Sequence, residues 1–496
     1  MIDLTICKES LEQNINKAKE NNVILPTFQQ MRYPEKNIPE KIKEKLANIG
    51  LWEVNPLNLF RITWKNERKM QGGLYSKPNY IELPKALTGV DAKIICMVGK
   101  YFPTGCHKVG ASFGCLVPRL VTGQFNSATQ KAVWPSTGNY CRGGAFNSKL
   151  LACDSIAILP EGMSRERFDW LRTIAGEIIA THGSESNVKE IFDKTNELRT
   201  RDDVMIFNQF DEMGNYLWHY KVTGNGISEA FEDLSKADGG NLNFAGICLM
   251  SGSAGSMASG DYLKQEYPQS KIAVGEALQC PTILNNGFGD HRIEGTGDKH
   301  IPWVHNVKNT DMAIAIDDND AIALLRLFNE PAGKTFLTKE AGMNTEEVEQ
   351  LAYMGISGIS NMLCAIKLAK YYELTSKDVV ATVLTDSVEM YLSRLEELNE
   401  AEGEYTASCA SFDFGASLHG IRTDSMLELT YPERKRVHNL KYYTWVEQQG
   451  KCADELNDQW YNQDKTFKSI QTQAEQIDEL INEFNEATGV MKEVCK

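Results

Sequence analysis

The sequence predicts an α/β fold built on a mostly parallel sheet. Short apolar, β-branched runs recur from about residue 90 to residue 390, and segments with helical periodicity follow them. The runs are apolar throughout rather than alternating, as expected of strands that helices cover on both faces. The expected strands are residues 93–98, 155–160, 177–181, 204–207, 245–250, 271–277 and 379–384, with helices at 165–176 and 187–199. Such sheets bind ligands at the carboxyl ends of their strands, so the turns there are the places to look for chemistry.

Two flanking regions differ from this alternating core. Residues 1–85 predict an irregular arm with some helix, and residues 401–496 are polar and mainly helical. Near the end, apolar residues at spacings of three and four predict one long helix with a single stripe. The stripe consists of Phe467, Ile470, Ala474, Ile477, Ile481 and Phe484. We expect it to dock on the protein's own core, because the heptad run is too short to indicate a dimer seam.

Composition excludes several classes of function. A chain of 496 residues can bury the cores of two or three domains, and its net charge of -15 argues against binding nucleic acid or an anionic membrane. Asp3, Lys8 and Glu9 interrupt any apolar signal core, so a cytoplasmic location is expected. Twelve scattered cysteines suit reduced thiols. Neither the cysteines nor the eight histidines show metal-ligand spacing, and no metal is predicted.

The segment TGCHKVGASFG (residues 104–114) places Lys108 between a Thr-Gly turn and a run of small residues. Small residues indicate a close approach of backbone or ligand. A lysine kept from bulk solvent has a lowered pKa and becomes a nucleophile that can form a Schiff base. Taken alone the signal is weak, since most lysines are solvated surface groups.

Three more turns follow apolar runs. WPSTGNYCRGGAF (134–146) could hold a carboxylate at a helix N-terminus, and SGSAGSMASG (251–260) could form a nest of backbone amides for a phosphate monoester. VLTDSVEMYLS (383–393) places Ser387 at a strand end. Each has a plainer interpretation: a capped helix start for the first and third, and a flexible turn for the second.

Taken in order, these four segments resemble the cysteine synthase, cystathionine β-synthase and tryptophan synthase β family of fold type II pyridoxal-phosphate enzymes. Residues 160–181, 208–227, 291–302 and 355–370 are similar to further segments of that family, and the similarity covers about residues 85 to 400. It implies two three-layer αβα domains with mostly parallel sheets. Residues 86–130 and 208–400 would form the large cofactor-binding domain, and residues 131–207 a smaller mobile substrate domain. An N-terminal arm (1–85) and a helical C-terminal extension (401–496) would flank them.

The resemblance also implies a role for each matching position. Lys108 would hold pyridoxal 5'-phosphate as a Schiff base and, once the substrate frees it, act as the base at Cα. His107 beside it and Asn139, at the ring oxygen, would bind the cofactor, while Gly295 would line the rim and Ser387 would face the pyridine nitrogen. The cofactor phosphate would be held by Gly252, Ser253, Ala254, Gly255 and Ser256. The substrate carboxylate would be held by Ser136, Thr137, Gly138 and Gln209.

The residue types at three positions also bear on the reaction. A hydroxyl at Ser387 leaves the pyridine nitrogen unprotonated, which makes a weaker electron sink than an aspartate would and suits loss of a group from Cβ. Tyr140 departs from the small hydroxylated residue of cysteine synthases, and could either assist proton transfer or fill the pocket wall. Ala254 stands where a glycine is usual, a mild change for a site made of backbone amides.

The leading functional prediction is β-elimination or β-replacement on a small amino acid through an aminoacrylate intermediate. L-Cysteine, L-serine or an O-activated serine are the expected substrates. Residues 140–143 leave open an ammonia-lyase of the diaminopropionate or serine/threonine type. A third alternative is an inactive paralogue used as an assembly scaffold, against which the joint presence of Lys108, Asn139 and the 252–256 loop argues. A homodimer is expected, with no nucleic-acid or membrane partner.

Overall fold

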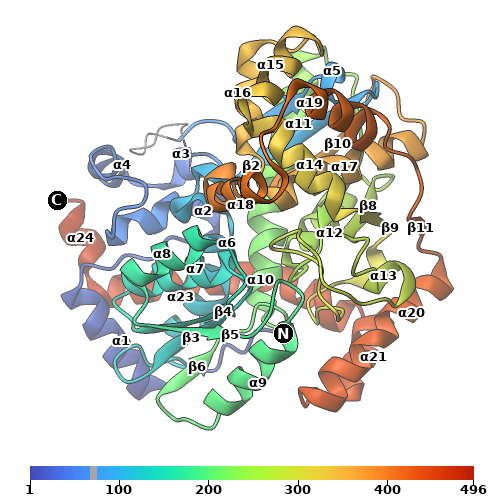
Figure 1. Cartoon of the computed structure of the whole chain (residues 1–496). Helices are drawn as coiled ribbons and strands as arrows, with labels where there is room; N and C mark the ends of the chain where they lie inside the picture. Colours follow the sequence, from blue (N-terminus) through green and yellow to red (C-terminus); the bar gives the residue numbers. More distant parts are fainter. Residues whose placement is uncertain (67–74) are drawn as a thin grey trace.

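The computed structural model describes residues 1–66 and 75–496, and within them the chain forms two sheets (Figure 1). The larger has seven strands in the order β1-β2-β10-β7-β8-β9-β11. Its five inner strands are parallel, and the two edge strands β1 and β11 run antiparallel to their neighbours. The strands are β1 (Tyr80–Leu83), β2 (Lys93–Val98), β7 (Asn243–Met250), β8 (Lys271–Ala277), β9 (Met312–Ile316), β10 (Asp378–Leu384) and β11 (Met426–Glu428).

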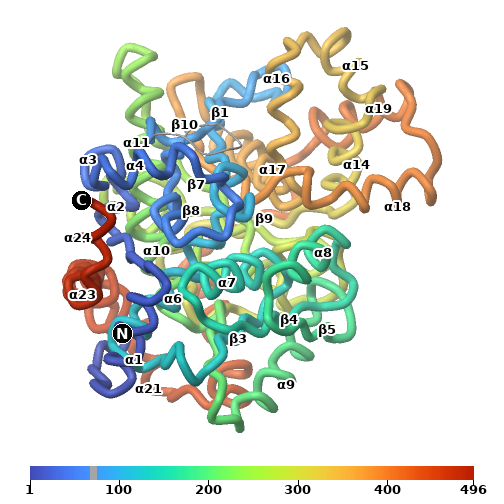
Figure 2. The backbone as a smooth tube through the Cα atoms, turned by 90° about the vertical axis from the view of Figure 1, so that its left-hand side faces the viewer, coloured from blue at the N-terminus to red at the C-terminus, as the bar shows by residue number. Residues whose placement is uncertain are grey.

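The smaller sheet has four strands, all parallel, in the order β5-β4-β3-β6. The strands are β3 (Lys131–Pro135), β4 (Ser155–Pro160), β5 (Glu177–Thr181) and β6 (Val204–Ile206). Helices α7 (Asn139–Leu150), α8 (Arg165–Ile174) and α9 (Val188–Leu198) connect them. This sheet, with α7 and α8 beside it, lies next to the larger one (Figure 2). All its strands fall within residues 131–207, the segment predicted to form the substrate domain.

Both faces of the large sheet are covered, as its uniformly apolar strands predict. Along β2, Ile95 and Met97 pack into one core cluster, whereas Ile94, Cys96 and Val98 pack into another on the opposite face. Helix α17 (Ile356–Tyr371) packs on β10 and β7, and α12 (Ala258–Glu266) packs on β8. The sheet therefore forms the middle of three layers, which confirms the predicted architecture.

The seven strands predicted from apolar runs are all present, with ends that differ by up to two residues. Three further strands, β1, β9 and β11, were not predicted, and β3 contains the strand-like residues before the 134–146 motif. Strand β9 is buried along its whole length between β8 and β11. Its sequence, Met-Ala-Ile-Ala-Ile, combines two alanines with three β-branched or long apolar residues, which gives little preference for strand over helix.

Helix α6 (Lys108–Thr122) runs through the centre of the molecule and packs against α7 and α10 (Met213–Trp218). The helices touch backbone to backbone at one point, because a Cβ on Gly114 would lie 2.4 Å from the carbonyl oxygen of Gly214. Glycine is therefore required there by packing. The other helices of this part of the chain are α5 (Lys85–Thr88), α11 (Gly224–Ala237), α13 (Thr282–Asn285), α14 (Asp318–Asn329), α15 (Pro331–Lys339) and α16 (Thr345–Gln350).

The two ends of the chain pack together. Helix α23 (Gln473–Thr488) contacts α1 (Lys8–Glu20), α2 (Phe28–Arg32) and α6, and the Asn485 amide pairs with both backbone groups of Leu25 at 2.9 and 2.8 Å. All six residues of the predicted apolar stripe are buried in the main core, so docking on the protein's own core is confirmed. The expected single helix is broken at Thr472, which separates α22 (Ser469–Gln471) from α23. The remaining terminal helices are α3 (Pro34–Asn37), α4 (Glu40–Leu46), α18 (Leu392–Glu402), α19 (Ala407–Asp413), α20 (Tyr431–Lys441), α21 (Ala453–Tyr461) and α24 (Val490–Val494).

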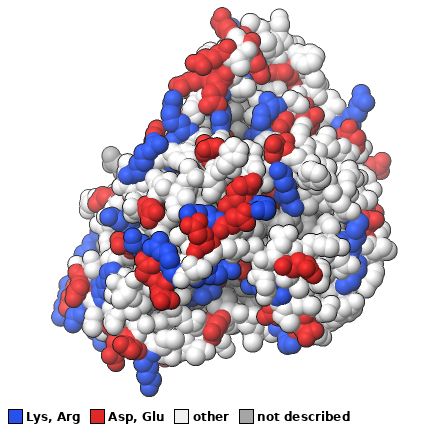
Figure 3. Space-filling model, turned by 60° about the horizontal axis from the view of Figure 1, so that its bottom comes forward, with Lys and Arg blue, Asp and Glu red and all other residues white. Residues whose placement is uncertain are grey.

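The surface has mixed charge. On the face in Figure 3, acidic and basic side chains are interspersed and no large basic patch appears. All twelve cysteines, which lie in the described ranges, are free thiols. Within those ranges no single helix is long and apolar enough to span a bilayer, and only α16 and α17 with the turn between them reach that length together, bent by 114°.

Candidate active site

Lys108 is the first residue of α6, and a turn connects β2 to this helix. Two successive residues with left-handed backbone, Thr104 (φ 68°) and Gly105 (φ 66°), turn the chain from the strand side into the helix. The Lys108 side-chain nitrogen donates a 3.1 Å hydrogen bond to the Ser253 hydroxyl. Burial lowers the pKa of Lys108, against the opposing pull of Cys106 and Asp298. The amine is thereby brought closer to the unprotonated state that a nucleophile needs.

His107 lies directly before Lys108 and its ring is buried. The ring stacks on Trp64 with 5.6 Å between centroids and meets His219 edge-on at 5.1 Å. Burial, together with the charge of Lys108, lowers the pKa of His107 to about 3. A neutral imidazole in this position supports the start of α6 without adding positive charge beside the lysine.

The loop between β3 and α7 contains the predicted substrate residues. The Ser136 hydroxyl accepts a 3.0 Å hydrogen bond from the Gly138 backbone and one of 3.3 Å from the side chain of Gln209. Gly138 has φ 145°, and a Cβ there would lie 2.5 Å from Cδ of Arg167. The structure thus brings Ser136, Gly138 and Gln209 together, and Thr137 is within hydrogen-bonding reach of Glu185.

The loop at residues 251–256 joins the end of β7 to α12, as the motif predicted. Ser253 is shared: its hydroxyl accepts from Lys108 and also, at 3.1 Å, from the Asn215 side chain. A Cβ on Gly252 would lie 2.5 Å from the Gly295 carbonyl oxygen, and one on Gly255 would collide with Asn215. The glycines are needed because the rim loop and α10 press against this turn.

Ala254 has φ 57° and ψ 8°, a left-handed conformation that glycine adopts without penalty. The substitution noted in the sequence therefore carries some backbone strain, although it leaves the amide nitrogens of the loop in place. Ser256 and Gly255 begin the short turn that precedes α12.

Asn139 begins α7, and its amide donates a 2.7 Å hydrogen bond to the Asp386 carboxylate, 247 residues away. Asp386 is fully buried and directly precedes Ser387 at the end of β10. Ser387 is buried as well and makes no side-chain capping bond to the turn that follows. The capping role considered from the sequence is therefore wrong. The Ser387 hydroxyl therefore makes no capping hydrogen bond, and Ser387 adjoins Asp386, the partner of Asn139.

Two buried carboxyl groups belong to the site although the sequence did not point to them. Asp298 follows the rim glycines Gly295 and Gly297, and Glu185 lies in the loop after β5; their side chains are 7% and 2% exposed. One oxygen of each has no hydrogen-bond partner in the described chain. Burial raises the pKa of Asp298 to about 7, opposed by Lys108, and burial also raises the pKa of Glu185. Single acidic residues in polar loops carry no sequence signal, so only the fold could reveal them.

Tyr140 is the second residue of α7 and is buried. Its ring meets Trp134 edge-on with 5.4 Å between centroids, and burial, with a smaller effect of the nearby Cys115 side chain, raises its pKa well above the usual range. Cys115 is about two turns along α6 from Lys108. This placement favours the wall-filling role over the proton-transfer role, the two alternatives that the sequence left open.

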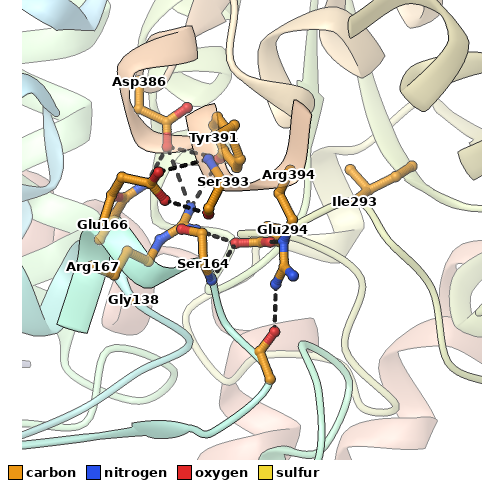
Figure 4. A network of polar contacts seen from close by, with 12 residues as sticks. Gly138, Ser164, Glu166, Arg167, Ile293, Glu294, Asp386, Tyr391, Ser393 and Arg394 are labelled. Atoms are coloured by element: carbon orange, nitrogen blue, oxygen red, sulfur yellow. Dashed lines mark hydrogen bonds and ion pairs between the residues drawn. The ribbon is translucent and has the colours of Figure 1, made fainter. Parts of the chain in front are cut away.

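A network of charged side chains joins α8 to the large sheet around this site (Figure 4). Arg167 pairs with Glu294 and donates to the Tyr391 hydroxyl at 2.9 Å, and that hydroxyl donates to Asp386 at 2.9 Å. Arg394 holds the other oxygen of Glu294 at 2.6 Å. Glu166 accepts 2.7 Å bonds from the backbone and hydroxyl of Ser393. Helix α8 is therefore tied to the rim loop and to the Asp386–Ser387 turn.

These residues fit the phosphorylated cofactor that the resemblance implies. An aldehyde needs an amine with a lowered pKa, which Lys108 provides. A phosphate needs backbone amides close to a helix start, which residues 252–256 provide. The Asn139 amide and the Ser387 hydroxyl supply polar groups for the ring. Loop 136–139 and Gln209 supply donors for a carboxylate.

Comparisons with known proteins agree with this geometry. The chain is 29% identical over 262 residues to cysteine synthase from Staphylococcus aureus, covering 53% of this chain and 75% of that protein. It is 25% identical over 326 residues to cystathionine beta-synthase from Saccharomyces cerevisiae, covering 63% of this chain and 59% of that protein. No family model matches the sequence.

Solved structures show the same fold. A hydrogen sulfide-producing enzyme from Fusobacterium nucleatum superposes with a TM-score of 0.53 and 23% identity, covering 67% of this chain and 92% of that one. An O-acetylserine-dependent cystathionine beta-synthase from Helicobacter pylori gives 0.52 and 22%, covering 64% and 94%. Cysteine synthase from Entamoeba histolytica gives 0.55 and 18%, covering 69% and 93%. The predicted fold type II architecture is confirmed.

Proposed function

We propose that this chain, which is similar in sequence to a cysteine synthase and a cystathionine beta-synthase, is an enzyme that uses pyridoxal 5'-phosphate for β-elimination or β-replacement on a small amino acid. One observation carries the proposal. The Lys108 amine, its pKa lowered by burial, hydrogen-bonds at 3.1 Å to a serine of the 251–256 loop. The Lys108 amine is thus in contact with the loop that would hold the phosphate, although Lys108 and Ser253 lie 145 residues apart in the chain.

Each remaining residue has a task that follows from its donors and acceptors. When bound, the cofactor would supply an electron sink that makes the Cα proton of an amino acid acidic. Lys108, once released, would accept that proton. Asn139 would donate to the ring oxygen, and the Ser387 hydroxyl would face the ring nitrogen without protonating it. The amides of residues 252–256 would hold the phosphate.

The carboxylate of the substrate would bind to the loop between β3 and α7. Ser136 and Gln209 are already in contact there at 3.3 Å, and the amides at the start of α7 would donate to the same carboxylate. Because this loop belongs to the small sheet and Lys108 to the large one, binding of the substrate would bridge the two. L-Cysteine, L-serine and O-activated serines are the substrates we propose.

A second candidate, an ammonia-lyase acting on a diamino acid, is favoured by Glu185 and Asp298. Both carboxyl groups are buried, both affect the pKa of Lys108, and each has an oxygen without a partner in the described chain. Such groups would accept hydrogen bonds from an ammonium or amine on Cβ and would disfavour an anionic leaving group. The homodimer and the cytoplasmic location stay predictions of the sequence.

The test is reduction of the purified protein with borohydride after incubation with pyridoxal phosphate. We expect a visible absorbance band, and a reduced adduct on the peptide that contains Lys108, in the parent and in Lys100→Ala but not in Lys108→Ala. Lys100 is a suitable control because it lies just upstream in a surface ion pair with Glu389. An adduct that persists in Lys108→Ala would overturn the proposal. Sulfide from cysteine, against ammonia from 2,3-diaminopropionate, then separates the two candidate reactions.

A further inference from the structure

The side-chain amide of Asn139 is held at both ends by buried charged groups. Its nitrogen donates to Asp386 at 2.7 Å, and its oxygen accepts from the guanidinium of Arg142 at 3.3 Å. Asp386 and Arg142 are each completely buried. Arg142 lies over the rings of Trp52 and Trp170, at 5.6 and 4.9 Å from their centroids. Neither partner of Asn139 can move away easily.

These partners determine which way the amide faces. A guanidinium only donates hydrogen bonds, so the Asn139 oxygen must face Arg142, and the nitrogen is left to donate to Asp386. One N–H of Asn139 then remains for the pocket. A free N–H suits an anionic ring oxygen, whereas a rotated amide would present its own oxygen and repel that anion.

One Asp386 oxygen accepts from two donors, the Asn139 amide and the Tyr391 hydroxyl. Burial raises the pKa of Asp386, and Arg167, Asn139, Tyr391 and Arg142 act in the opposite direction. The closest cation, Arg167, is 3.6 Å away, and the Tyr391 hydroxyl bridges the two at 2.9 Å on each side. The other carboxylate oxygen packs against Gly355, where an added Cβ would lie 1.9 Å from it. The side chain is therefore fixed in position.

Resting on the proposed function, we propose that Asp386 is a positioning residue that sets the Asn139 amide to donate to the cofactor ring oxygen. Arg167 of α8 supports it, so the docking of this helix onto the large sheet is coupled to the orientation of a cofactor contact. Asp386 itself need not touch the cofactor. Its effect on cofactor binding must then pass through Asn139.

A double-mutant cycle on cofactor affinity tests this coupling. Apo-protein of the parent, Asp386→Asn, Asn139→Ala and the double variant is titrated with pyridoxal phosphate, and the Kd is read from tryptophan fluorescence. Asp386→Asn keeps the shape but offers an N–H to Asn139, so the amide can rotate. We expect the Kd to rise about tenfold in the Asn139 background and less than twofold in the Asn139→Ala background. Equal effects in both backgrounds would overturn the proposal.

Two further variants protect the test against loss of folding. Tyr391→Phe removes one hydrogen bond to Asp386 and leaves the carboxylate, so it should weaken binding about threefold and lose that effect in Asn139→Ala. Asp311→Asn is the control: Asp311 is a largely buried carboxylate paired with Lys264 and Arg434, away from the pocket. It should lower the melting temperature without changing the Kd. A Kd change in Asp311→Asn as large as in Asp386→Asn would reduce the effect to general destabilisation and overturn the proposal.

The outcome also separates this inference from the proposed function. A parent protein that binds no pyridoxal phosphate would refute both. A parent that binds it covalently at Lys108, but shows no coupling between Asp386 and Asn139, would refute the inference alone.

Discussion

The side-chain nitrogen of Lys108 lies 3.1 Å from the hydroxyl of Ser253, and this contact joins the turn after β2 to the turn after β7. Both strands belong to the parallel part of the large sheet, separated only by β10. The carboxyl ends of parallel strands open at one edge, where side chains and helix N-termini converge. Asp386 and Ser387, after β10, meet the site at the same edge. Three strand ends thus build one pocket.

Replacing Asn139 with alanine should leave cofactor bound but slow its reaction with an amino acid. The phosphate-binding residues and Lys108 are unchanged in this variant. It loses one hydrogen bond to a buried group, which costs about 1–3 kcal/mol. Stopped-flow absorbance after mixing with cysteine or serine measures the rate. A variant with the parent's spectrum and the parent's rate would remove Asn139 from the site.

Replacing Ser387 with aspartate should change the reaction rather than the fold. A carboxylate beside the ring nitrogen would raise that nitrogen's pKa by about one to three units, because an opposite charge favours the protonated form. Electrons would then be stored on the ring more readily, so the elimination rate should fall and slow transamination could be detected as a keto acid. Ser387→Asn is the neutral control of the same size. Identical product ratios in the aspartate and asparagine variants would contradict the role of Ser387.

Replacing Ala254 with glycine should be much better tolerated than the same change at Ala258. Ala254 has φ 57°, where a Cβ costs about 1–2 kcal/mol, whereas Ala258 has φ -60° at the start of α12 and both are buried. Glycine relieves strain at the first position and only removes helix propensity, about 1 kcal/mol, at the second. Urea unfolding of the apo-proteins should therefore place Ala254→Gly above Ala258→Gly by about 2–3 kcal/mol. Equal stabilities would mean that the loop is not strained.

Replacing Asp298 with asparagine should flatten the dependence of stability on pH. Burial raises the pKa of Asp298 from 3.8 to about 7 in the folded apo-protein, so the folded state binds this proton more tightly than the unfolded state does. The contribution is complete below pH 4 and is lost as the pH rises through about 7. The free energy of unfolding of the parent, relative to Asp298→Asn, should fall by a few kcal/mol over that interval.

Asp290→Asn serves as the control for this measurement. Asp290 is an exposed carboxylate of the same loop, and hydrogen bonds from Ser186 and Lys299 lower its pKa, so its linkage acts below pH 4. Denaturant melts at several pH values should therefore show the parent's slope for Asp290→Asn between pH 4 and 8. The same slope for Asp298→Asn would show that its carboxyl is solvated in solution.

The sequence alone determined the fold class, most strands of the two sheets and the four turns that carry the pocket. Apolar runs report burial on both faces of a strand, and Gly, Ser and Thr turns report backbone geometry, so both signals are local. They placed Lys108 and the loops 134–146 and 251–260 after strands, whereas the grouping of Ser136 and Gln209 with Lys108 in one site was implied by the resemblance to the cysteine synthase family. Strand β9 was not predicted because its alternating alanines have little preference for strand over helix.

Only the tertiary structure decided what surrounds those residues. Asp386 meets Asn139 across 247 residues, and Arg167 reaches Tyr391 across 224. Nothing in the local sequence distinguishes these charged residues from solvated ones. Asp298 and Glu185 likewise became part of the site only because two separate loops bury them near Lys108. Burial and charge pairing are properties of the packed chain, so the pKa values and the orientation of the Asn139 amide could be established only after folding placed these groups together.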